Sequence, residues 1–209
     1  ELMTARSADG TDERRLDVLT SAGVILVSVL LGGVTSWAQG FLPESLSSFA
    51  NSSSGWMIIT ALLVWAVRRN VALSAFLGAA SFLALVLGYT GASALRGLTY
   101  SPVMFGVIGV VVGPVIGIAA AWLRCRGCRL ALAVSALSGV AIGEAIYGLT
   151  VVADTTSPVY WVGVGLLGLA LIAAVTVRQR SDHLPAVSGM ALTAVVATAF
   201  VVVYRSVGT

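Results

Sequence analysis

The sequence predicts an all-α protein that crosses a membrane as a bundle of seven helices. The chain of 209 residues is 58% hydrophobic and only 10% charged, and its mean hydropathy is +0.98. Soluble domains of this size do not have such a composition. The apolar residues also gather into seven long runs. Most of these runs approach the roughly 20 residues that a helix needs to cross a bilayer.

The runs define one transmembrane domain over residues 17–209, preceded by a polar tail over residues 1–16. They cover residues 18–39, 52–67, 71–89, 102–123, 129–152, 159–177 and 186–205. The second run is the shortest, so we expect it either to begin earlier, near Ser47, or to enter the membrane at a slant. The first run is too long for a signal peptide, and six further runs follow it.

The basic residues predict the orientation in the membrane. All twelve are arginine, and seven spans place ten of them on one side. These ten are Arg6, Arg14, Arg15, Arg68, Arg69, Arg124, Arg126, Arg129, Arg178 and Arg180, whereas Arg96 and Arg205 fall on the other side. Because cytoplasmic loops are rich in arginine, we expect a cytoplasmic N-terminus and an outside C-terminus in the inner membrane. This clustering in short connections argues against nucleic-acid binding, although the pI is near 9.2.

One carboxylate lies inside an apolar run. Glu144 precedes the expected helix end by about eight residues, which is roughly 12 Å at about 1.5 Å per residue. An ionisable group at this depth is costly, so we interpret Glu144 as a functional residue that faces the bundle interior. Gly143, Gly148 and Ala141 would leave room around it. The alternative is a buried, hydrogen-bonded acid with a structural role.

The predicted outer half collects two more acids and many aromatic residues. Glu44 follows the first run and Asp154 follows the fifth, so both could converge with Glu144. The residues that could surround them are Trp37, Phe41, Asn51, Trp56, Tyr89, Tyr100, Tyr147, Tyr160 and Trp161. Simpler explanations exist: aromatic residues form interfacial belts or core, Asp154 could be an ordinary loop carboxylate, and Glu44 could cap a short helix.

This set of residue types fits two kinds of chemistry. A carboxylic acid in an apolar site tends to keep its proton, and aromatic faces stabilise cations. Such a site could start cation chemistry on an apolar substrate, or it could couple transport to a proton. An alkene is a weak base, so an acid that protonates it needs a further hydrogen bond to sharpen its acidity.

Other motifs are weak. Cys125 and Cys128 form a lone CxxC, and zinc would need two more ligands although His183 is the only histidine. No Walker A, GxGxxG, HExxH or Asp-rich diphosphate motif occurs, so we expect neither a metal nor another cofactor. The glycine stripe of the fourth run, at Gly106, Gly109, Gly113 and Gly117, should allow close helix packing.

Five short segments carry a resemblance to a known group of enzymes: Trp37-Ala-Gln-Gly-Phe-Leu-Pro-Glu44, Ala50-Asn51-Ser52, Gly88-Tyr89, Gly113-Pro114 and Gly143-Glu144. With its size and seven spans, the chain resembles small bacterial integral-membrane terpene cyclases of the drimentine type. These are similar in architecture to the seven-helix meroterpenoid cyclases of fungi.

The resemblance implies cyclisation of a farnesyl chain that is already attached to an indole or similar acceptor, without a metal. An acid would protonate the terminal alkene, aromatic rings would stabilise the carbocations, and deprotonation would end the cascade. Glu144 and Glu44 would act as acid and base partners, with Asp154 as the third acid.

Two other classes of function remain open. The chain could be a membrane transporter, or the substrate-binding subunit of an uptake system, which usually has six spans and a water-soluble ligand. It could also be an interaction protein that forms a homo-oligomer through the glycine stripe, but that role would leave Glu144 unexplained.

Overall fold

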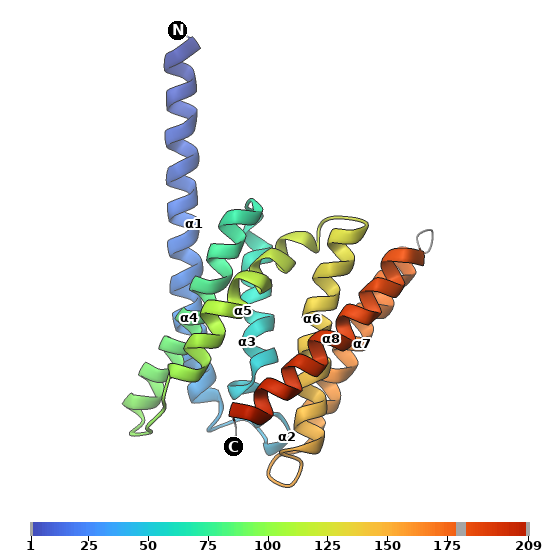
Figure 1. Ribbon diagram of the computed structural model, residues 1–209. Coiled ribbons are helices and arrows are strands. Elements are labelled where there is room, and N and C mark those ends of the chain that lie inside the picture. The colour runs from blue at the N-terminus through green and yellow to red at the C-terminus, as the bar shows by residue number, and fades with distance from the viewer. Residues whose placement is uncertain (1, 179–182, 208–209) are drawn as a thin grey trace.

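The computed structural model describes residues 2–178 and 183–207, and within them it is helical with no strand (Figure 1). The predicted all-α fold is therefore confirmed. The elements are α1 (Leu2–Ala38), α2 (Glu44–Ser47), η1 (Ser48–Asn51), α3 (Ser53–Val67), α4 (Val71–Leu95), α5 (Val103–Trp122), α6 (Cys128–Thr150), α7 (Pro158–Arg178) and α8 (His183–Val207).

Within the described residues, six helices are long and apolar enough to cross a membrane, which makes the chain a multi-pass membrane protein by length and composition. These are α1, α4, α5, α6, α7 and α8. A seventh span results if α2, η1 and α3 are counted together, and its two parts meet at 62°. The slanted or earlier start expected for the second run thus corresponds to a bend just before Ser53.

α1 and α4 extend furthest beyond the runs that the sequence pattern suggested. α1 begins at Leu2, so residues 2–16, which were expected to form a polar tail, are part of the first helix. α4 ends at Leu95 rather than near residue 89, because the next residue that breaks the helix is Gly97, with a φ of 74°.

α1 begins and α8 ends at opposite ends of the bundle (Figure 1), while the sidedness in the membrane remains a prediction. Arg180 lies outside the described residues.

The long helices form two groups, and α2, η1 and α3, which we together call the broken span, lie between them (Figure 1). In the first group, α4 packs along both α1 and α5; in the second, α6 packs along both α7 and α8. α3 contacts α4 and α5 on one side and α6 on the other. The bend before α3 therefore lies where the two groups meet.

Glycines allow the close helix contacts within each group. A Cβ atom at Gly117 of α5 would overlap the carbonyl oxygen of Ser74 in α4, and one at Gly78 would overlap that of Gly113. The glycine stripe is therefore used for packing inside the chain, which is the simpler of its two sequence interpretations. It is largely covered by α4 and offers little surface for a homo-oligomer.

We expect Gly117→Ala to lower the free energy of unfolding by about 1–3 kcal/mol, because the added methyl group forces α4 and α5 apart. Gly106→Ala in the same helix is the matched control, because its Cβ would meet only a Leu83 methyl group at 4.0 Å. Unfolding by SDS in mixed micelles measures both. Equal stability of the two variants would contradict the close α4–α5 contact.

Candidate functional site

The first turn of α3 begins inside the protein. Ser52 has extended backbone angles (φ −130°, ψ 149°), and its Oγ accepts a hydrogen bond from the Gly55 amide at 2.9 Å. Serine is a preferred residue at this position because its short side chain can accept such a bond. Ser53 and Ser54 are buried, so their amides also need acceptors other than water.

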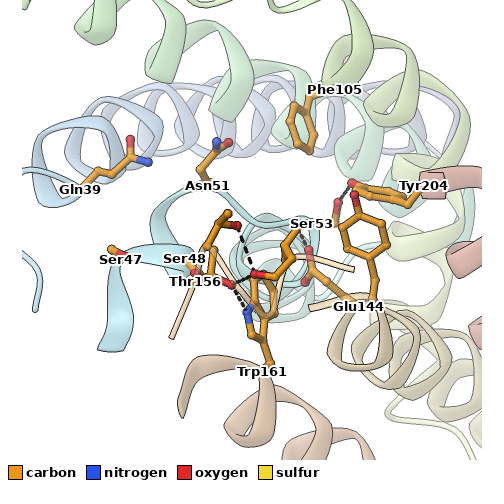
Figure 2. A pocket seen from close by; sticks show the side chains of 13 residues that line it. Gln39, Ser47, Ser48, Asn51, Ser53, Phe105, Glu144, Thr156, Trp161 and Tyr204 are labelled. Carbon is orange, nitrogen blue, oxygen red and sulfur yellow. Dashed lines mark hydrogen bonds between the residues drawn. The ribbon is translucent and has the colours of Figure 1, made fainter. Parts of the chain in front are cut away.

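Glu144 provides both acceptors from the C-terminal half of α6. The Ser53 amide donates to Oε1 at 2.7 Å (Figure 2). The Ser54 amide donates to Oε2 at 2.8 Å. The Glu144 side chain is 3% exposed, which confirms the expected inward orientation. A carboxylate is favourable here because the N-terminal end of a helix carries partial positive charge.

The small residues near Glu144 make room for neighbouring helices rather than for the carboxylate. A Cβ atom at Gly143 would crowd Ala197 and Phe200 of α8, and one at Gly148 would overlap the Trp161 ring of α7. These glycines therefore set the spacing of the second helical group around α6.

Two tyrosine hydroxyls attach the same turn to the remaining helices of that group. Tyr160 of α7 lies with its OH 2.5 Å from the Ser52 Oγ, and Tyr204 of α8 shares a hydrogen bond with the Ser53 Oγ. All three helices of the second group thus bind the start of α3. Tyr204 was not among the predicted site residues, and the one available signal was a phenol near the end of a mostly apolar run.

A polar pocket of about 300 Å³ opens beside this turn (Figure 2). Its volume is at the lower end of the range for small-molecule sites, about 300–1,000 Å³. Amides, hydroxyls, one carboxylate and several rings line it: Gln39, Ser47, Ser48, Asn51, Ser53, Phe105, Glu144, Tyr147, Val152, Thr155, Thr156, Trp161 and Tyr204. The Trp161 ring is held in place by its Nε1, which donates to the Thr156 Oγ1 at 2.8 Å.

A second cavity of about 310 Å³ adjoins the first at Ser53 and Tyr204, which line both. It lies between α5 and α8, and α3, α4 and α6 also contribute to its wall. Its remaining lining is apolar: Met57, Phe82, Ile108, Val112, Ile116, Val140, Val195, Val196, Ala199, Phe200 and Val203.

The structure brings together only part of the predicted site. Asn51, Tyr147 and Trp161 line the polar pocket with Glu144, whereas Tyr160 bonds to Ser52 and does not line the pocket. The other two acids, Glu44 and Asp154, are exposed and line neither cavity in the part of the chain that is described. Trp37 and Phe41 are also exposed, and the Arg96 guanidinium lies 5.5 Å from the Trp37 ring centre.

Three further predicted residues belong to a separate aromatic cluster. Trp56 is fully buried, with its ring centre 5.5 Å from Tyr89 and 4.8 Å from Phe105. Tyr100 packs on Tyr89 at 4.7 Å, and the Tyr89 OH donates to the Gln39 amide oxygen at 2.6 Å. Of these rings, only Phe105 reaches the polar pocket, so Trp56, Tyr89 and Tyr100 form core rather than pocket wall.

The cysteines do not join the site. Cys125 and Cys128 are free thiols in the connection to α6. Among the described residues, no group of three or more His, Cys, Asp or Glu side chains is placed to hold a metal ion.

The two amide bonds determine what Glu144 can do chemically. They stabilise the negative charge that remains when the carboxylic acid gives up a proton, whereas burial opposes that charge. This is the kind of hydrogen bonding that a proton donor to a weak base requires. Protonation weakens the same two bonds, so the proton on Glu144 and the position of the first α3 turn are linked.

We expect Glu144→Ala to lower the free energy of unfolding strongly, because it leaves two buried amides without acceptors at about 1–3 kcal/mol each. Asp154→Ala is the matched control, because Asp154 is an exposed acid in the loop after α6. SDS unfolding in mixed micelles compares the two. A Glu144→Ala variant as stable as the control would show that the amides do not depend on this carboxylate.

Comparisons with known proteins identify the family of the chain. Searches of curated proteins and of solved structures found no significant match. A family model described as "Family of unknown function (DUF6518)" matches residues 11–209, which is nearly the whole chain. The protein is therefore a member of the DUF6518 family.

Proposed function

We propose that the protein binds a small molecule in the cavities between its two helical groups and carries it within or across the membrane. One observation carries this proposal: α3, the second half of the broken span, begins at Ser53, which lines both cavities. The first turn of α3 is bound there by Glu144. Discontinuous helices whose ends lie inside the membrane form the substrate sites of many transporters.

The Glu144 bonds suggest how such binding could respond to protons. Among residues 13–178 and 188–206, whose burial is described, Glu144 is the one buried acid, and its two acceptor bonds join α6 to α3. Because protonation removes the charge that these bonds stabilise, it loosens the contact between the second helical group and the broken span. A proton and a ligand could therefore bias the same contact.

Cyclisation of a prenylated substrate is the second candidate function. The hydrogen-bonded Glu144 and the adjoining apolar cavity favour it, since they offer a sharpened acid beside room for a hydrocarbon chain. It takes second place because the proposed acid and base partners, Glu44 and Asp154, are exposed and line neither cavity described here. Glu144 or a water molecule would then have to accept the final proton as well.

Native mass spectrometry of protein extracted in polymer-bounded nanodiscs tests the first proposal. We expect a bound small molecule in the wild type and a loss of about two- to tenfold in occupancy in Asn51→Leu, which removes one hydrogen-bonding side chain from the pocket. Asp154→Asn should keep the wild-type occupancy. Absence of any bound molecule in the wild type would contradict the proposal.

The cyclase candidate predicts a different result. Membranes that contain the protein would convert a farnesylated indole into a product of unchanged mass and altered retention time. Glu144→Gln should abolish this conversion, and Asp154→Asn should leave it intact. Conversion of this kind would place catalysis ahead of transport, and its absence across several prenylated acceptors would exclude the cyclase.

A further inference from the structure

We infer that the two cavities bind one amphiphile together, with an uncharged, hydrogen-bonding head group in the polar pocket and a hydrocarbon chain in the apolar cavity. This inference rests on the proposed function, because it assumes that the cavities hold a ligand. It adds the chemical class of that ligand and its orientation in the site.

The two cavities share part of their walls. Ser53 and Tyr204 line both, and the hydrogen bond between their hydroxyls stands at the junction. Tyr204 packs against the ring of Phe200 in the same helix, with ring centres 4.2 Å apart. It also packs against the ring of Tyr147 in α6, with ring centres 5.5 Å apart. A ligand that occupies both cavities would therefore lie against this pair, with polar surroundings on one side of it and apolar surroundings on the other.

The lining of the polar pocket favours a neutral head group. Gln39 and Asn51 offer amides, and several serine and threonine side chains offer hydroxyls. No arginine, lysine or histidine is found among its described lining residues, so an anionic head would lack a partner. Glu144 is 3% exposed and already accepts two amide bonds, so it offers little attraction to a cation. An alcohol or amide matches the remaining groups.

The lining of the apolar cavity fits a hydrocarbon chain. Apart from the Ser53 and Tyr204 pair, every described lining residue is aliphatic, aromatic or methionine. A wholly polar ligand would gain no hydrogen bonds there and would leave this volume to lipid. The two volumes, about 300 and about 310 Å³, give the head and the chain similar space.

Photolabelling tests the inference. The probe is a monoacylglycerol with a diazirine on its chain, added to nanodiscs that contain the protein, and labelled peptides are mapped by mass spectrometry. We expect labels at cavity residues of α5 and α8 such as Val112 and Val196. Ala199→Phe should remove most of this labelling, because it fills the cavity. Val202→Phe is the matched control, since Val202 lies on the same helix, is 60% exposed and does not line the cavity.

The head group is tested separately. Asn51→Leu should lower labelling by the monoacylglycerol probe about two- to tenfold, which corresponds to one lost neutral hydrogen bond. A fatty-acid probe with the same chain should label the cavity less than the monoacylglycerol. The inference would be overturned if a phospholipid probe labelled the cavity as strongly as the monoacylglycerol and if Asn51→Leu did not change that labelling. An ordinary bilayer lipid would then fill the cavity.

The remaining outcomes distinguish this inference from the proposed function. A polar molecule retained in native mass spectrometry, with no cavity labelling sensitive to Ala199→Phe, would overturn the inference and leave the proposed function standing. No retained molecule and no such labelling would overturn both.

Discussion

The structure depends on the pair of hydrogen bonds between the Glu144 carboxylate and the first two amides of α3. A helix that begins inside a membrane protein exposes amides that no water can satisfy, and each unpaired group is costly. Glu144, which belongs to the second helical group, removes that cost by accepting hydrogen bonds from two of these amides. The Tyr160 and Tyr204 hydroxyls of the same group form hydrogen bonds with Ser52 and Ser53. The broken span is thereby tied to α6, α7 and α8, and both cavities form around the attachment.

This arrangement gives Glu144 a structural role and, under the proposed function, a chemical role as well. The ionised carboxylate holds the α3 turn in place, so any event that changes its charge, whether uptake of a proton or loss of a proton to a substrate, changes the contact between α6 and α3. The separation of Glu44 and Asp154 from the pocket leaves one acid where the sequence suggested three. A single acid coupled to a helix position suits a protein that binds and releases a ligand better than one that needs a separate acid and base.

Much of the fold could be predicted from the sequence because hydropathy alone determines which segments enter a bilayer. The inward orientation of Glu144 also followed, since a lipid-facing acid is too costly. The partners of Glu144 could not be predicted, because Ser53 lies 91 positions away and only the packing of α3 against α6 brings them together. The placement of Trp56 and Tyr89 could not be predicted for a related reason: their sequence pattern is the same whether the rings line a pocket or, as here, pack on each other.

Amide hydrogen exchange at Ser53 and Ser54 tests the central claim most directly. In wild-type protein in nanodiscs, both amides should exchange slowly, because the Glu144 carboxylate accepts from them in the interior. In Glu144→Ala they should exchange much faster, whereas the Leu73 amide, which donates to Asn70 at the start of α4, should be unchanged. Equal exchange at Ser53 and Ser54 with and without Glu144 would contradict the account.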